Sequence, residues 1–213
     1  MKISPGSRVV IIGDSITDCG RDRDAAEDTP EAIGNGYVAI ANALVAVEGA
    51  ARKIHMINRG VSGDTIRDLE ARWDSDAIAL HPDWLAVMIG VNDVWREFDE
   101  RASMRALAVS PSEYERIYDA LLTRARPHLR GLVLLSPFYV QPDRTDLMRT
   151  KVETFGAIVK RLAARHGAFF VDTQAAFDWM LFHVGVTQLA PDHVHPTLLG
   201  HTVIANALLT ALR

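Results

Sequence analysis

The stretch Val9-Val10-Ile11-Ile12-Gly13-Asp14-Ser15 decides the fold. Four consecutive β-branched residues are typical of a parallel strand that is covered on both faces. The glycine-containing turn that follows places Ser15 at the carboxyl end of this strand, the edge at which open α/β sheets bind ligands. Ser15 is therefore a candidate catalytic residue, and the alternative is that it only caps the following helix.

Strand and helix patterns alternate along the rest of the chain. The apolar runs predict five strands: Arg8–Ile12, Lys53–Ile57, Trp84–Ile89, Gly131–Leu135 and Ala168–Val171. Apolar spacing near 3.6 residues predicts helices between and after them: Tyr37–Val47, Thr65–Leu80, Pro111–Arg126, Asp146–His166 and Pro196–Leu212. This alternation predicts a three-layer α/β/α sandwich with a five-stranded parallel sheet, formed by residues 1–213 as a single domain.

Composition excludes several classes of partner. The 213 residues are 48% hydrophobic and 23% charged, and 23 basic against 27 acidic side chains give a net charge of −4. Without a long basic run, nucleic acid or an anionic membrane is not an expected partner. Cys19 is the only cysteine, so no intrachain disulfide or cysteine-based zinc site can form. Since no run approaches 18 apolar residues, no transmembrane helix is expected. The default expectation is a cytoplasmic enzyme.

A nucleophile and a base occur at opposite ends of the chain. A free serine is a poor nucleophile, so Ser15 needs a base to accept its proton. His195 is the candidate base, and Asp192, three residues earlier, can hold the imidazole Nδ1–H. The pattern predicts a Ser15–His195–Asp192 triad at the carboxyl edge of the sheet.

Acyl transfer also requires donors aimed at the developing oxyanion. We expect these to be the backbone N–H groups of Ser15 and Gly60 and the side-chain amide of Asn92. Each has a simpler interpretation: Gly60 for its backbone angles, and Asn92 as a turn residue.

Four blocks of the chain resemble the signature blocks of the SGNH (GDSL-type) hydrolases, in order and in approximate spacing. They are Gly13-Asp14-Ser15, Asn58-x-Gly60-x-Ser62-Gly63, Gly90-x-Asn92-Asp93 and Asp192-x-x-His195. Ile16 stands where leucine is commonest in the family. The resemblance covers essentially the whole chain, and it implies a serine esterase that needs no metal or organic cofactor.

Within that family the chain is similar to bacterial acetyl esterases that act on acetylated xylo-oligosaccharides. The resemblance implies an acetylated sugar as substrate and a homo-oligomer as the working state. The alternative is the same chemistry on a non-carbohydrate ester, such as a lysophospholipid, aryl ester or thioester. The segment Arg21–Pro30 is expected to be a solvated surface loop, and the alternative is a rim of the site or an oligomer contact.

Asp14, Trp95, Arg96 and Tyr139 are candidate substrate contacts. For the last three, packing in the core or in an interface is the alternative, and Asp14 has the alternative of bonding loop amides. A metal site is a further alternative, because His-x-His is a ligand spacing. Its candidate ligands are Asp192, His193, His195 and His201.

Overall fold

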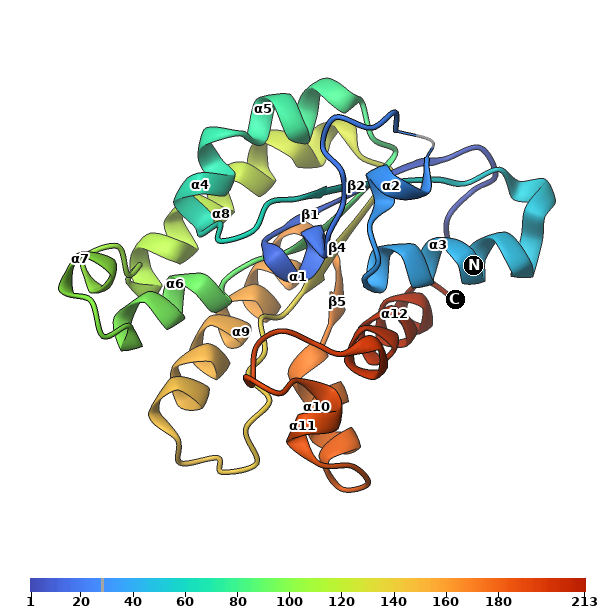
Figure 1. Ribbon diagram of the computed structural model, residues 1–213. Coiled ribbons are helices and arrows are strands. Elements are labelled where there is room, and N and C mark those ends of the chain that lie inside the picture. The colour runs from blue at the N-terminus through green and yellow to red at the C-terminus, as the bar shows by residue number, and fades with distance from the viewer. Residues whose placement is uncertain (28) are drawn as a thin grey trace.

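A computed structural model describes residues 1–27 and 29–213. Its centre is one five-stranded, all-parallel sheet in the order β2-β1-β3-β4-β5 (Figure 1). The strands are β1 (Arg8–Gly13), β2 (His55–Gly60), β3 (Trp84–Met88), β4 (Gly131–Leu135) and β5 (Phe169–Val171). The predicted five-stranded parallel sheet is confirmed.

Helices follow every strand. The longer ones are α3 (Tyr37–Gly49), α8 (Pro111–Ala125), α9 (Leu147–His166), α10 (Thr173–Leu181) and α12 (Leu198–Leu212). The shorter ones are α1 (Ser15–Asp18), α2 (Pro30–Ile33), α4 (Ile66–Ala71), α5 (Trp73–Asp76), α6 (Val91–Trp95), α7 (Ala102–Arg105) and α11 (Val186–Leu189). Short 3₁₀ turns occupy Ala50–Arg52, Ile78–Leu80, Arg96–Phe98 and Arg126–His128.

The helices form a layer on each face of the sheet. Helices α3 and α12 pack together on one face, and α4, α8 and α9 pack on the other (Figure 1). Strand β3 is buried along its whole length, as the continuous apolar run of a doubly covered strand requires. Among the described residues, no helix has the length and apolar character needed to cross a bilayer.

The strand order reverses at β1, and this reversal locates the site. The chain passes from β1 to β2 on one side of it and then returns to β3 on its other side. In open α/β sheets the crevice at such a switch point, outside the carboxyl ends of the strands, is the usual ligand site. Ser15 follows β1 and Asn92 follows β3, so both lie at this point.

The largest differences from the predicted boundaries are in β2 and in the helical segment that follows it. Strand β2 begins at His55 and continues to Gly60, because its ladder with β1 runs to the pair Gly13–Gly60. The helix predicted over Thr65–Leu80 is broken at Arg72, whose φ of −109° and ψ of 8° are not helical. Within the predicted loop Arg21–Pro30, Asp28 lies outside the described residues.

Candidate active site

Ser15 is positioned by a tight turn at the end of β1. A side chain on Gly13 would lie 2.3 Å from the carbonyl oxygen of Met88 and 2.4 Å from Thr17 Oγ1, so only glycine allows this close approach. Asp14 caps α1 by accepting the N–H of Ile16 at 3.0 Å. Ser15 is thereby fixed as the first residue of α1, at the carboxyl edge of the sheet.

The structure brings the three predicted triad residues together. Ser15 Oγ lies 3.1 Å from His195 Nε2, and His195 Nδ1 lies 2.6 Å from Asp192 Oδ2. The other Asp192 oxygen accepts the backbone N–H groups of Val194 and His195, at 3.1 and 2.7 Å. Residues 192–195 therefore form a turn that contains the acid–base pair and also holds the Asp192 carboxylate in place.

The Asp192 carboxylate is kept in its charged form by these bonds. Burial alone would raise the pKa of Asp192, but the hydrogen bonds from His195 and Val194 outweigh burial and lower it. An ionised Asp192 can accept the Nδ1–H of His195, which leaves Nε2 free to take the proton of Ser15.

Asp14 lies beneath the site. The residue is only 1% exposed, and burial raises the pKa of its carboxyl to about 7. This placement fits the alternative in which Asp14 bonds loop amides, and it does not fit a substrate contact.

Gly60, a predicted oxyanion donor, is turned away from the site. Its N–H donates to Asn58 Oδ1 at 2.8 Å, so the group is already satisfied. A side chain on Gly60 would lie 2.1 Å from the backbone nitrogen of Asp18, so glycine is required there by the close approach of α1. The predicted donor role for Gly60 does not fit this geometry, because its N–H faces a protein acceptor.

The loop of residues 61–64, which joins β2 to α4, is anchored on one side to the nucleophile's own helix. Val61 N–H donates to the Gly13 carbonyl at 3.0 Å. Asp18, the last residue of α1, accepts both the N–H and the hydroxyl of Ser62, at 3.0 and 3.1 Å. The loop is therefore attached to the element that carries Ser15.

The other side of the loop is anchored to α6 and the 3₁₀ turn that follows it. Arg96 donates to the Gly63 carbonyl at 2.8 Å, and the Asn92 side chain donates to the Asp64 carbonyl at 3.0 Å. Within the described parts of the chain, the N–H groups of Gly63 and Ser15 have no acceptor. An amide NH₂ has two hydrogens, so Asn92 retains one as well. Three donors thus remain unused at this edge.

The remaining predicted contacts divide into two kinds. The Trp95 ring lies 5.7 Å from the His195 ring, and Tyr139 stacks on His193 at 5.3 Å, so both aromatic residues border the triad loop. Arg96 is instead held by the protein, between the Gly63 carbonyl and Met104 Sδ.

The histidines of the alternative metal site have separate partners. His193 Nδ1 contacts the Val140 carbonyl at 2.7 Å. His201 accepts the Tyr37 N–H on Nδ1 at 3.1 Å and places Nε2 3.2 Å from Cys19 Sγ. Across residues 1–27 and 29–213, no group of three or more His, Cys, Asp or Glu side chains is arranged to hold a metal ion.

Sequence reasoning missed two residues of the site. Gly63 is the glycine whose N–H is free, and its φ of +87° marks a turn that favours glycine. The sequence Ser62-Gly63-Asp64 around it could have indicated such a turn. Arg72, which contacts this loop through Asp64 at 2.6 Å, had no signal, because it occurs within a helical pattern.

A Ser–His–Asp constellation at the switch point of a parallel sheet defines a serine hydrolase of the α/β class. The GDSL-like Lipase/Acylhydrolase family matches residues 11–203, and the chain belongs to that family. It is a carboxylic ester hydrolase, and the SGNH resemblance of its sequence is confirmed.

Similar proteins match this chain over nearly its full length. An acetylxylan esterase of Geobacillus stearothermophilus is 43% identical over 209 residues, covering 98% of this chain and 95% of the relative. A solved structure of that enzyme matches with a TM-score of 0.96 at 42% identity, covering 100% of this chain and 96% of the other. An α/β hydrolase from the metagenome of Lake Arreo, Spain, matches with a TM-score of 0.96 at 46% identity, covering 100% and 97%. Solved catalytic mutants of the Geobacillus enzyme each replace a serine, a histidine or an aspartate by alanine.

Proposed function

We propose that this chain removes acetyl groups from xylo-oligosaccharides or related carbohydrates. The observation that carries the chemistry is the continuous chain of hydrogen bonds from Ser15 through His195 to Asp192. The substrate is supported by the acetylxylan esterase relative, whose similarity extends over 98% of the chain.

The triad supplies both half-reactions. His195 Nε2 takes the proton of Ser15 as Oγ attacks the acetyl carbonyl, and Asp192 stabilises the imidazolium that forms. His195 then gives the proton to the leaving sugar oxygen, which leaves an acetyl ester on Ser15. Water, activated by the same histidine, attacks this ester and releases acetate.

The oxyanion would be bound by the three unused donors: the N–H groups of Ser15 and Gly63 and the side-chain amide of Asn92. Two of them are backbone groups on short, anchored segments, so they need little reorganisation as the charge develops. In this proposal Gly63 takes the role that the sequence pattern gave to Gly60, and Arg96 supports the loop instead of binding sugar.

An open site favours a small acyl group on a bulky alcohol. The side chains of His195 and Asp192 are 47% and 48% exposed. A long acyl chain gains affinity by burying apolar surface, which an open site offers sparingly. Trp95 and Tyr139 border the triad loop, and we propose that they contact the sugar.

The first test of this function is Ser15→Ala, assayed on p-nitrophenyl acetate. We expect turnover to be lost with the fold intact, because only a small hydroxyl is removed. Ser103→Ala, at an exposed position of α7, is the matched control and should keep wild-type kcat. Comparable turnover in a folded Ser15→Ala variant would overturn the serine mechanism.

The substrate class is tested by a panel of p-nitrophenyl esters of rising chain length beside acetylated xylo-oligosaccharides. We expect kcat/KM to fall as the acyl chain lengthens and acetate to be released from the oligosaccharides. Higher kcat/KM on long acyl esters, without acetate release from the sugars, would favour a non-carbohydrate ester.

We also propose that residues 1–213 act as one domain, in the cytoplasm, and as a homo-oligomer. Large apolar side chains support association, since Trp179, Phe182 and Leu198 are all exposed. The free thiol of Cys19 is compatible with a reducing compartment. Light scattering on the purified protein tests the assembly, and a monomer would contradict it.

A further inference from the structure

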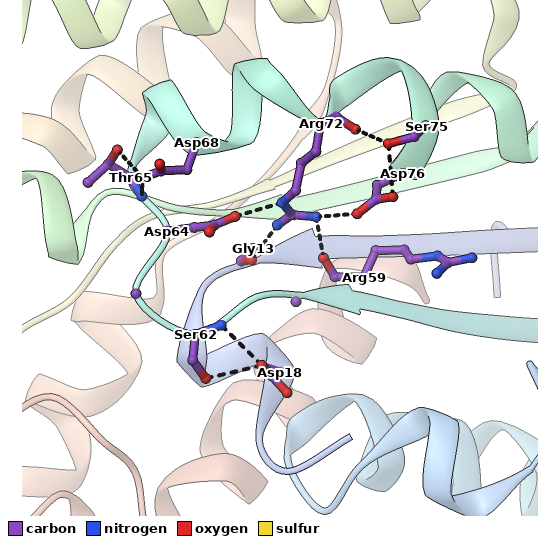
Figure 2. A network of polar contacts seen from close by, with 12 residues as sticks. Gly13, Asp18, Arg59, Ser62, Asp64, Thr65, Asp68, Arg72, Ser75 and Asp76 are labelled. Atoms are coloured by element: carbon purple, nitrogen blue, oxygen red, sulfur yellow. Dashed lines mark hydrogen bonds and ion pairs between the residues drawn. The ribbon is translucent and has the colours of Figure 1, made fainter. Parts of the chain in front are cut away.

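Arg72 connects three segments that are far apart in the sequence. It stands between α4 and α5, where the helical path is broken, and its side chain is 15% exposed. Figure 2 shows its guanidinium reaching between the ends of two strands and the loop beyond them.

Each nitrogen of the Arg72 guanidinium has a different acceptor. Nη2 donates to the Gly13 carbonyl at 2.9 Å, Nη1 donates to the Arg59 carbonyl at 2.7 Å, and Nε donates to Asp64 Oδ2 at 2.6 Å. Asp76 accepts a further bond from Nη1 at 2.9 Å (Figure 2). The side chain thus joins the end of β1, the end of β2 and the loop of residues 61–64.

The contacted groups adjoin the atoms that matter for catalysis. The Gly13 carbonyl lies two residues before Ser15, and Asp64 directly follows Gly63. Since peptide units are planar, fixing the Gly13 carbonyl also fixes the Asp14 N–H at the start of the turn. Asp18 completes the link from the other direction, because it bonds Ser62 from the end of α1 (Figure 2).

We propose that Arg72 is a positioning residue that sets the distance between the Ser15 N–H and the Gly63 N–H. This inference rests on the proposed function, which makes those two groups oxyanion donors. Arg72 touches no substrate: it acts through Gly13 on one donor and through Asp64 on the other. Oxyanion donors must lie about 2.7–3.1 Å from the developing charge, so a small shift of one segment weakens transition-state binding more than substrate binding.

A lysine cannot replace this side chain. A guanidinium presents donors in a fixed planar fork, whereas an ammonium is a compact point charge. Arg72→Lys keeps a positive charge beside Asp64 and cannot span the two strand carbonyls as well. The comparison of the two cations separates positioning from simple neutralisation of Asp64.

The test measures kcat and KM on p-nitrophenyl acetate for Arg72→Ala and Arg72→Lys. We expect kcat to fall about 10- to 100-fold in both, with KM within about 3-fold of wild type. Arg67→Gln on neighbouring α4 is the control, since Arg67 pairs with Glu113 and not with the loop. Added methylguanidinium should partly restore kcat in Arg72→Ala, which a general loss of stability would not show.

Wild-type kcat in Arg72→Lys would overturn the positioning role, and so would a change confined to KM or to thermal stability. If Arg72→Ala does not fold, Arg72→Lys alone decides between these outcomes. A serine-directed phosphonate, located by peptide mass, tests the proposed function separately. Failure to label Ser15 in the wild type would sink the serine mechanism, whereas labelled Ser15 with unchanged kcat in both Arg72 variants would sink only the positioning role.

Discussion

The two halves of the site are held in different ways. The acid–base half is open, with Asp192 and His195 nearly half exposed, and the bonds that hold the Asp192 carboxylate connect residues within one turn, although His195 also contacts Ser15, 180 residues away. The half that we propose binds the oxyanion, the oxyanion half, is closed: Asp64 and Arg72 are 9% and 15% exposed, and their bonds connect segments up to 59 residues apart. The Asp192–His195 pair is encoded locally, whereas the loop that carries Gly63 is held by tertiary contacts.

This difference predicts how each half responds to substitution. In the locally held half, a substitution should change the chemistry and leave the fold alone, because few tertiary contacts depend on it. In the oxyanion half, a substitution should disturb packing and rate together, unless it removes only the donor.

The largest effect that separates the halves is expected for Asp192→Asn. The asparagine can still accept the N–H groups of Val194 and His195, so the turn should survive. Its NH₂ would then face His195 Nδ1 and favour the wrong tautomer, which costs up to about 10⁴-fold in kcat in other triads. Steady-state kinetics and thermal melts check this prediction.

Asp143→Asn is the matched control, since Asp143 likewise accepts a backbone N–H two residues on, from Thr145. It should leave kcat unchanged. If the thermal midpoint of Asp192→Asn falls so far that unfolding explains the lost kcat, the Asp192–His195 pair is not held by local contacts alone.

The same contrast explains what sequence reasoning could predict. Strand β1 and the triad were predicted correctly in position, because a continuous apolar run and an Asp-x-x-His spacing are local patterns. The glycine whose N–H is free was not predicted. Gly60 and Gly63 both occur in the second block, and the choice between them depends on Asn58 and on the approach of α1. Those are tertiary contacts that no local pattern contains.

The next effect is expected for Asn92→Ala. It should lower kcat by roughly 10²–10³-fold, as when a single oxyanion donor is removed elsewhere, and KM should change much less. The Asp64 carbonyl also loses a bond, so a small fall in thermal stability is expected with it. A hundredfold rise in KM at constant kcat would instead make Asn92 a ground-state binding residue.

The two glycines of the second block should fail differently when each is replaced by alanine. Gly60→Ala should lose stability first, because its side chain would meet the α1 backbone at 2.1 Å. Gly63→Ala has room, with the nearest atom at 3.8 Å, and should remain folded with backbone strain of about 1–2 kcal/mol. Its kcat should fall about 10-fold as the N–H tilts. Wild-type kcat in a folded Gly63→Ala variant would contradict the expected tilt of the N–H, since alanine keeps this donor.

The smallest effect concerns His201 on α12. It contacts Cys19, which directly follows α1, and lies close enough to His195 for their charges to interact. Burial, and then the charge of His195, lower the pKa of His201 to about 4 from an ordinary value of 6.5. The folded state therefore holds His201 neutral where the unfolded chain would protonate it.

The sign of the pH effect follows from that difference. The stability that neutral His201 contributes is complete above pH 6.5 and is lost as the pH falls toward 4, by up to about 3 kcal/mol. Buried Asp14, whose raised pKa acts in the opposite direction, titrates over the same range, so the wild-type curve alone cannot isolate His201. His201→Asn keeps an acceptor for the Tyr37 N–H and removes the titration. Denaturant unfolding of both proteins from pH 7.5 to 4.5 should therefore show the wild type losing stability relative to the variant as the pH falls. A constant gap between the two curves would mean that folding does not lower the pKa of His201.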